Sequence, residues 1–478
     1  MLFNSLAFLI FFPLVVIVTL LLPMRYRWLW LLPASCFFYM YWKIEYGFLL
    51  LFTASIDYLA ALAMPKASPA WRRLLLVISL VSNLAVLFFF KYFNFFNHNL
   101  QALFHSLHLP WAVPFSDLLL PVGISFYTFQ SLSYTIDVYR GVIPIERHYG
   151  RFLLFVTFFP QLVAGPIERA RNLLPQFYQQ FEFDYQRITD GLRRMAWGFF
   201  KKLVIADRLA VYVNTVYNHP ADFSGGPVWL ATYFFAFQIY CDFSGYSDIA
   251  IGAAQVMGFT LMENFRRPYH SRSIREFWQR WHISLSTWFK DYLYIPLGGN
   301  RVGAGRRQLN MLVVFLISGL WHGANWTFII WGALHGFYMV FSGWVAPLRS
   351  RLYMWSGMVH WPRLLAAMQV VVTFHLVLFS WIFFRANSLS DALLILKKLW
   401  IWPAAHQSVA LGKVEMAVAL LALLLLAGVE WIQQKGSWRR LLADKPVWVR
   451  RSLYYALVMI ILLFGMMTRE QQFIYFQF

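Results

Sequence analysis

The sequence predicts an all-α protein that crosses a membrane with many helices. Its composition is the first reason, because 60% of the residues are hydrophobic and only 13% are charged, whereas soluble domains carry about 25% charged residues. The second reason is that long apolar runs recur along the whole chain. A helix needs about 20 residues to cross roughly 30 Å of hydrocarbon, and on that basis we expect about ten to twelve transmembrane helices, with re-entrant or interfacial helices between them.

The apolar runs fall into two groups by length. The first group approaches or reaches a full span: Leu6–Leu22, Tyr46–Met64, Leu74–Phe90, Leu364–Phe384, Val414–Val429 and Leu453–Met467. The second group is shorter or interrupted by polar residues: Trp28–Trp42, Phe152–Val163, Trp229–Tyr240, Met311–Leu320 and Phe328–Phe341. These shorter runs can still cross a membrane where neighbouring helices shield them, because lipid excludes only unsatisfied backbone and exposed charge.

Basic residues near the N-terminus predict the orientation of the chain. Only Met1–Ser5 precede the first apolar run, and no small-residue cleavage pattern follows it, so we expect this run to remain as the first helix. The loops that should face the cytoplasm are those rich in arginine and lysine. They contain Arg25 and Arg27 after the first run, and Lys66, Arg72 and Arg73 two runs later. The N-terminus is therefore predicted to face outward.

The net charge of +20 does not indicate a nucleic-acid partner. The basic residues are scattered over loops between apolar runs instead of forming one basic domain. Positive-inside topology and the anionic headgroups of a lipid bilayer account for most of them, and a cytoplasmic site for a phosphorylated donor can use the rest. Cys36 and Cys241 are the only cysteines and lie in apolar surroundings, so neither a disulfide framework nor a cysteine metal site is predicted.

The chain shows no internal repeat and no duplicated halves of the kind found in many transporters. We therefore predict a single membrane domain over residues 1–478, with its core at about residues 85–390. The polar segment Met262–Arg307 differs from the other loops. Its aromatic residues, including Phe277, Trp281 and Trp288, recur at roughly helical spacing with arginine and lysine between them. This pattern predicts an amphipathic helix at the cytoplasmic interface, and a plain interfacial anchor is an equally good interpretation.

Histidines are the main candidates for chemistry, because the chain lacks a nucleophile elbow, a Walker loop and a His-Glu-x-x-His zinc motif. Among twelve histidines, His322 is the strongest candidate. It lies beside an apolar run, Gly323 permits close backbone approach, and Asn325 offers a hydrogen-bonding partner. A neutral imidazole can accept the proton of a hydroxyl group, as acyl transfer to an alcohol requires. The alternative is a structural histidine that bonds to a neighbouring helix.

Three other histidines are expected to have other roles. His335 follows thirteen residues after His322 and would point to another face of one continuous helix, so it ranks lower. His375 has no polar neighbours in the sequence and is expected to be structural. His282 lies forty residues before His322 and can orient a donor or assist proton transfer. Three acids near apolar runs, Glu168, Asp242 and Asp248, either pair with arginines or line a substrate path.

At these positions the chain resembles the membrane-bound O-acyltransferase family, in its bacterial alginate O-acetyltransferase branch. The matching stretches follow one another in order over most of the chain. They are Phe90–Phe96, Leu120–Phe129, Ile136–Gly141, Gly165–Ile167, Gly198–Lys202, Asp242–Asp248, Phe277–Trp288, Leu297–Arg301, Gly319–Thr327 and Phe383–Ala386. Beyond about residue 400 only hydrophobicity matches.

The resemblance implies a fold and a site. The fold would be a ring of tilted helices around a central tunnel, with a cytoplasmic funnel for the donor. His322 matches the signature histidine of the family, His282 matches a second polar position upstream, and His335 matches a further histidine of the alginate branch. The residues predicted to bind substrate or donor are Arg280, Trp281, Trp321, Asn325, Asp242 and Ser284. No cofactor would be bound permanently.

The implied reaction moves an acyl group, most simply acetyl from acetyl-CoA, across the bacterial inner membrane. An extracytoplasmic partner of the SGNH hydrolase type would receive it within a polysaccharide synthesis or export complex. Whether that polysaccharide is alginate, cellulose or peptidoglycan is not encoded in recognisable motifs. The competing functions are a transporter and a catalytically silent scaffold of such a complex. A transporter would show internal repeats and paired charges along several helices, whereas the intact His322 and His282 argue against a scaffold.

Overall fold

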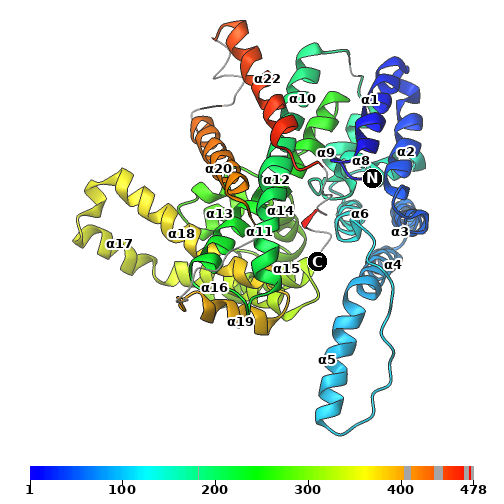
Figure 1. Cartoon of the computed structure of the whole chain (residues 1–478). Helices are drawn as coiled ribbons and strands as arrows, with labels where there is room; N and C mark the ends of the chain where they lie inside the picture. Colours follow the sequence, from blue (N-terminus) through cyan, green and yellow to red (C-terminus); the bar gives the residue numbers. More distant parts are fainter. Residues whose placement is uncertain (181, 403–410, 435, 437–444, 468–472, 475–478) are drawn as a thin grey trace. The chain divides into compact units, whose positions relative to one another are not determined.

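The computed structural model describes residues 1–180, 182–402, 411–434, 436, 445–467 and 473–474. Every regular element in this part of the chain is a helix, as Figure 1 shows. The all-α prediction is confirmed. The cause lies in the solvent, because a backbone inside lipid must satisfy its own hydrogen bonds and a helix does so within one segment.

Five helical stretches are long and apolar enough to cross a membrane. A sixth candidate is a bent pair, in which Trp326–Trp344 and Ala346–Trp355 meet at 58°. The five are Ile44–Lys66, Pro69–Ser106, Pro362–Arg385, Lys413–Gln433 and Val447–Phe464. The first apolar run forms a shorter helix, Leu6–Leu21. The chain is thus a multi-pass membrane protein, while the larger predicted count of spans is not confirmed by these lengths.

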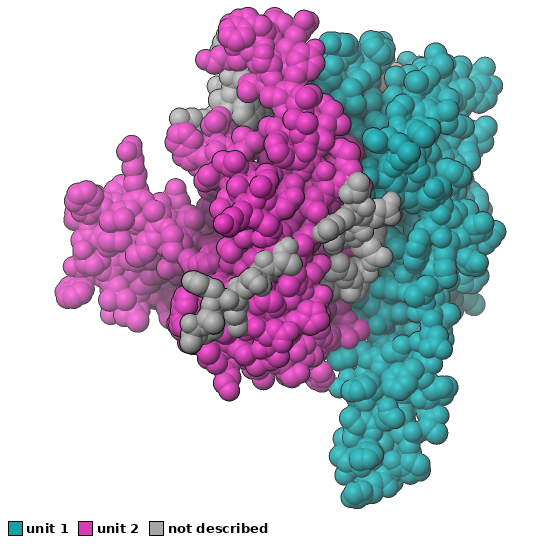
Figure 2. All heavy atoms as spheres, viewed as in Figure 1, with its two compact units in different colours: residues 1–195, 249–262 teal, residues 196–248, 263–478 magenta. Residues whose placement is uncertain are grey.

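The chain divides into two compact units, coloured separately in Figure 2. Unit 1 contains residues 1–195 and 249–262, and unit 2 contains residues 196–248 and 263–478. Two helices, α10 (Tyr185–Phe199) and α12 (Gly226–Val256), contribute residues to both. The proposal of a single functional domain over the whole chain stays a prediction.

Unit 1 is a set of helices whose starts are fixed by local sequence. Ser5 caps α1, and Ser68 caps α4 with Pro69 in its first turn. The elements are α1 (Leu6–Leu21), α2 (Met24–Met40), α3 (Ile44–Ala63), η1 (Met64–Lys66), α4 (Pro69–Leu87), η2 (Phe88–Tyr92), α5 (Phe93–Ser106), α6 (Ile124–Tyr139), α7 (Tyr149–Thr157), α8 (Phe159–Leu162), α9 (Ala170–Leu173) and η3 (Leu174–Tyr178). The apolar run Phe152–Val163 is not one helix, because α7 ends before Phe158 and Pro160 lies in the first turn of α8.

A buried carboxylate joins three helices of unit 1. Asp57 of α3 accepts hydrogen bonds from Ser79 Oγ at 2.5 Å and from Asn83 Nδ2 at 2.8 Å, both on α4, and another from Ser131 of α6. Asp57 is fully buried. Because a buried carboxylate needs hydrogen-bond donors and α4 and α6 supply them, this cluster fixes the register of the three helices.

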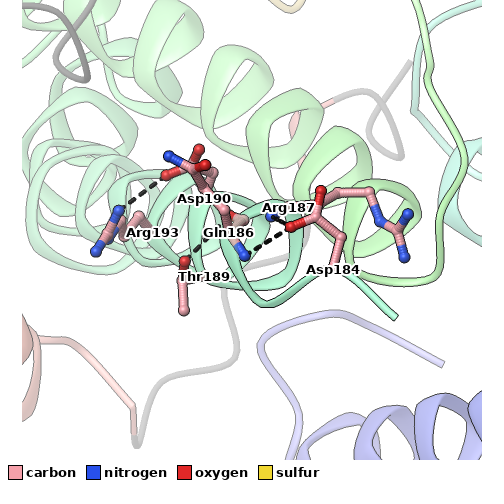
Figure 3. Close-up of polar contacts among 6 residues, drawn as sticks. All are labelled: Asp184, Gln186, Arg187, Thr189, Asp190 and Arg193. Atoms are coloured by element: carbon pink, nitrogen blue, oxygen red, sulfur yellow. Dashed lines mark hydrogen bonds and ion pairs between the residues drawn. The ribbon is translucent and has the colours of Figure 1, made fainter. Parts of the chain in front are cut away.

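The start of α10 is an exposed polar turn, shown in Figure 3. Asp184 Oδ1 accepts from the backbone N–H groups of Gln186 at 2.8 Å and Arg187 at 3.1 Å, so it caps the helix. One turn later, Asp190 and Arg193 form an ion pair of 2.8 Å. An acid before the first turn is favourable there because the N-terminus of a helix carries a partial positive charge.

Unit 2 contains the predicted site residues and is built around the pair α15 and α16. The elements are η4 (Phe200–Ala206), α11 (Asp207–Asn218), η5 (Pro268–His270), α13 (Ile274–Arg280), α14 (Ile283–Phe289), η6 (Lys290–Tyr294), α15 (Ala304–His322), α16 (Trp326–Trp344), α17 (Ala346–Trp355), η7 (Met358–His360), α18 (Pro362–Arg385), α19 (Leu389–Lys398), α20 (Lys413–Gln433) and α22 (Val447–Phe464).

Two glycines set the close approach of α15 and α16. A Cβ atom added to Gly319 would lie 2.3 Å from the carbonyl oxygen of Phe328, and one added to Gly332 would lie 2.3 Å from that of Phe315. The two helices therefore touch backbone to backbone, as small residues allow in membrane bundles. This crossing places the end of α15 beside the first turns of α16.

Candidate active site

His282 occupies a sharp break between α13 and α14. Its backbone is left-handed, with φ 42° and ψ 54°, an unfavourable region for a residue with a side chain. This break corrects the prediction of one amphipathic interfacial helix over Met262–Arg307. The aromatic residues of that segment also pack inward, since Phe277, Trp281 and Trp288 are all buried. The hydrophobic spacing in the sequence continues across His282, but α13 ends at Arg280 and α14 begins at Ile283. The aromatic residues on both sides of this break are buried in the protein.

Asn264 holds the ring of His282 in place. Its Oδ1 atom lies 3.1 Å from His282 Nδ1, 3.3 Å from the backbone N of Ser284 and 2.9 Å from Ser284 Oγ. The backbone N–H can only donate, so the atom facing it is the amide oxygen, and His282 Nδ1 must carry the proton. Its Nε2 is then the basic nitrogen. His282 is not part of any of the helices long enough to cross a membrane. Its burial in the protein lowers its pKa to about 3 and keeps the ring neutral.

His322 is the last residue of α15 and lies in an aromatic enclosure. Its ring centroid is 4.9 Å from those of Trp321 and Trp331 and 5.4 Å from that of Phe384. The turn that follows needs Gly323, where a Cβ atom would lie 2.2 Å from the ring of Phe328. His322 is 3% exposed, so bulk water does not surround its imidazole.

The structure brings His282 and His322 together, with 6.5 Å between their ring centroids. Trp321 lies beside both, 6.1 Å from the ring of His282. His282 is 0% exposed and His322 is 3% exposed, so both imidazoles are shielded from bulk water. The pair is therefore suited to moving a proton from a bound hydroxyl group.

His335 lies on α16 and not on a continuation of the helix that contains His322. The lower rank of His335 assumed one continuous helix, and that condition does not hold, because α15 ends at His322 and α16 begins at Trp326. Trp331 stands between them, 4.9 Å from the ring of His322 and 5.0 Å from that of His335. Both nitrogens of His335 are engaged, Nδ1 by Trp278 Nε1 at 3.2 Å and Nε2 by Ser380 Oγ at 2.9 Å.

Other residues predicted to bind substrate have protein partners. Arg280 forms a 2.5 Å ion pair with Glu276 and is half-buried. Trp281 is 1% exposed and packs on Trp381 at 5.1 Å. Asn325 caps α16 by accepting from Thr327 N at 3.1 Å and also donates to a backbone carbonyl at residue 387. The capping role explains an asparagine at this position without a substrate.

The buried acids pair mainly with lysines. Asp242 Oδ1 lies 2.6 Å from Lys202 Nζ, and its Oδ2 accepts from the backbone N of Ile474 at 2.7 Å. Asp248 pairs with Lys201 at 2.5 Å. Glu168, in unit 1, accepts from the backbone N of Met262. Burial raises the pKa of the Glu168 carboxyl to about 7, whereas the bonds it accepts lower it.

The surface near Arg280 is basic. Arg266, Arg272 and Arg275 are exposed and Arg267 is half-buried, and the backbone N of Arg266 donates to the carbonyl of Arg280 at 2.9 Å. Such a group of guanidinium side chains is well suited to phosphate recognition. Across the described ranges, no group of three or more His, Cys, Asp or Glu residues is arranged to hold a metal ion.

Sequence reasoning missed Asn264 and Trp331 as members of the site. Asn264 lies eighteen residues before His282, and only the left-handed turn at His282 brings the two side chains together. Trp331 was hidden among 22 tryptophans. Its position four residues before His335 was the available signal, because residues four apart share a face of a helix.

The helices define a multi-pass membrane protein, and the described part of unit 2 holds a buried pair of histidines. Comparison with protein-family models places residues 147–388 in MBOAT, the membrane-bound O-acyltransferase family. Similarity to curated relatives extends over most of the chain. The protein therefore belongs to the membrane-bound O-acyltransferase family and is an acyltransferase.

Relatives named for different activities share this similarity. The "Probable alginate O-acetylase AlgI" of Azotobacter vinelandii is 42% identical over 400 residues, which cover 82% of this chain and 76% of the relative. The "Peptidoglycan O-acetyltransferase" of Helicobacter pylori is 38% identical, covering 77% and 73%. The "Teichoic acid D-alanyltransferase" of Bacillus subtilis is 29% identical, covering 56% and 69%. The family and the acyl-transfer chemistry predicted from the motifs are confirmed.

Proposed function

We propose that this acyltransferase passes an acetyl group from cytoplasmic acetyl-CoA across the bacterial inner membrane, for O-acetylation of an extracytoplasmic polysaccharide. One observation carries the proposal: His282 and His322 lie side by side, both buried, with 6.5 Å between their ring centroids. The relatives named for alginate and peptidoglycan acetylation support acetyl as the group transferred.

In this proposal His322 is the general base. Its imidazole accepts the proton of an acceptor hydroxyl group as the oxygen attacks the thioester carbonyl. The C–O bond forms, the C–S bond breaks, and the thiolate of CoA takes the proton from the imidazolium. The balanced result is an ester and free CoA, with His322 neutral again. His282, held by Asn264 in one tautomer, orients the hydroxyl group through Nε2.

Exposed arginines support a phosphorylated donor, and the partner is the one that the resemblance to the family implies. The arginines Arg266, Arg272 and Arg275 are exposed and can bind the phosphates of CoA, with Arg280 beside them. The acetyl group then passes to an extracytoplasmic protein of the SGNH hydrolase type, which modifies alginate, cellulose or peptidoglycan. A polysaccharide synthesis or export complex would bring the two proteins together.

The test follows labelled acetyl-CoA in proteoliposomes that contain the purified protein and its partner. We expect His322→Ala to abolish acetyl transfer at equal folded yield, because no other group in the proposed mechanism accepts the proton. His105→Ala is the matched control, since His105 is exposed on α5, and it should retain full turnover. Equal turnover in wild type and His322→Ala would remove His322 from the mechanism. No turnover in either, with the right partner present, would favour the scaffold or transporter.

A further inference from the structure

Trp331 is one of the aromatic residues that enclose the ring of His322. It lies on α16, it is 0% exposed, and its ring meets that of His322 edge to face, at 4.9 Å and 87°. Other aromatic neighbours include Trp381, stacked at 5.8 Å, and Phe384 at 5.1 Å. Packing against these rings holds the indole in one orientation.

The indole N–H of Trp331 is buried and has no acceptor among the residues that the structure describes. The two neighbouring indoles differ in this respect. Trp278 Nε1 donates to His335, and Trp381 Nε1 donates to Tyr269 Oη at 3.2 Å. A buried donor without an acceptor destabilises the fold, so such a group calls for an explanation.

A second orphaned group lies on the same face of α16. Thr327 is four residues before Trp331 and fully buried, and its hydroxyl group has no partner in the described part of the chain. His335 is four residues after Trp331 and lies on the same face of α16, but both of its nitrogens have hydrogen-bond partners. On this face the described polar groups without partners are thus those of Thr327 and Trp331, in the first two turns of α16.

We infer that the Trp331 indole N–H binds the carbonyl oxygen of the acyl group and stabilises the negative charge that forms on it. The inference rests on the proposed function, in which His322 removes the proton of the attacking hydroxyl group. Attack converts the thioester carbonyl into an oxyanion, and the oxyanion needs a donor fixed in place beforehand. The acyl oxygen would then supply the acceptor that Trp331 lacks, with Thr327 as a second donor.

The test compares Trp331→Phe with Trp381→Phe in the acetyl-CoA proteoliposome assay. Both changes replace a buried indole by a phenyl ring within one stacked pair, but only Trp331 is assigned to the substrate. We expect Trp331→Phe to lower kcat about 100-fold to 1000-fold, the usual effect of removing one oxyanion donor, with KM for acetyl-CoA nearly unchanged. Trp381→Phe should change kcat less than tenfold.

A shape-matched variant protects the test against misfolding. Benzothienylalanine at position 331 replaces the N–H by sulfur and keeps the ring outline, so it should lower kcat as Trp331→Phe does. Activity within fivefold of wild type in either folded variant would overturn the inference, and the proposed function would stand if His322→Ala were inactive. An active His322→Ala would instead overturn the proposed function, whatever Trp331→Phe shows.

Discussion

Lys202 lies between two buried carboxylates of unit 2. Its Nζ is 2.6 Å from Asp242 Oδ1 and 2.9 Å from Asp207 Oδ1, and all three side chains are almost completely buried. One positive charge therefore separates two negative charges in a medium of low dielectric constant. The lysine is held by η4, and Asp207 begins α11, so the contact also fixes the junction of these helices.

Replacing Lys202 by methionine should strongly destabilise the fold. The two carboxylates would then face each other unpaired, and breaking a buried ion pair costs about 3–5 kcal/mol. Thermal unfolding in detergent measures the change. Lys397→Met, at an exposed lysine of α19, should leave stability unaltered, and adding Asp207→Asn to Lys202→Met should restore part of it. A Lys202→Met protein as stable as wild type would show that the pair contributes nothing.

Single residues also show what the sequence could not predict. His322 stood out because an imidazole beside an apolar run is costly, and that argument needs no contact information. Its neighbour His282 and the amide of Asn264 meet only in three dimensions. For Asp242 the sequence left an arginine partner or a substrate path open, and a neighbouring lysine is its partner in the structure.

At the scale of elements, the crossing of α15 and α16 positions the histidine. Gly319 lies three residues before His322, and Gly332 directly follows Trp331. Gly319→Ala should therefore reduce both stability and acetyl transfer, because the new methyl group would lie 2.3 Å from the carbonyl oxygen of Phe328 and force the helices apart. Overpacking of this kind costs about 1–3 kcal/mol.

The control for this change is Gly343→Ala, also on α16, where an added Cβ atom meets nothing within 4 Å. It should leave activity intact and keep or slightly raise the unfolding temperature, since alanine favours a helix over glycine. Both variants are compared by unfolding in detergent and by turnover. If Gly319→Ala behaved like Gly343→Ala, the close crossing would not be needed to hold the site.

Element boundaries were predictable where sequence signals are local. Serine caps mark the starts of α1 and α4 and are signals of this local kind. The break at His282 gives no such signal, since the residue in the left-handed conformation is neither glycine nor asparagine. The hydrophobic spacing alone therefore predicts one helix where the structure has two, α13 and α14.

For the whole molecule, composition was enough to predict an all-α membrane protein. The average hydrophobicity of the residues indicates whether a chain is surrounded by lipid or by water. Composition is not enough to predict the number of spans. Helices such as α12 combine apolar residues with buried polar residues, and a membrane tolerates the polar residues only where neighbouring helices shield them. Ser244, Asp242 and Ser247 of α12 are all buried. Hydropathy cannot separate such a helix from a loop-rich segment.

The predicted orientation of the N-terminal part of the chain can be tested on one continuous helical stretch, Pro69–Ser106. Its 38 residues would extend about 57 Å at a rise of about 1.5 Å per residue, more than the roughly 30 Å of hydrocarbon. Arg72 and Arg73 at its start predict a cytoplasmic N-terminal end. Ser106, at the other end, should then lie outside. Because the chain has only two cysteines, Cys36 and Cys241, a wild-type blank can account for background labelling.

We expect Ser106→Cys to react with a membrane-impermeant maleimide in intact spheroplasts, and Ala70→Cys to react only after the membrane is permeabilised. Both positions are exposed in the structure, so a difference in labelling reports the side of the membrane and not burial. Reaction of Ala70→Cys alone in intact spheroplasts would invert the predicted orientation of this stretch and place Arg72 and Arg73 outside. Reaction of both would mean that this stretch does not cross the membrane, and the span count would have to be built from the other helices.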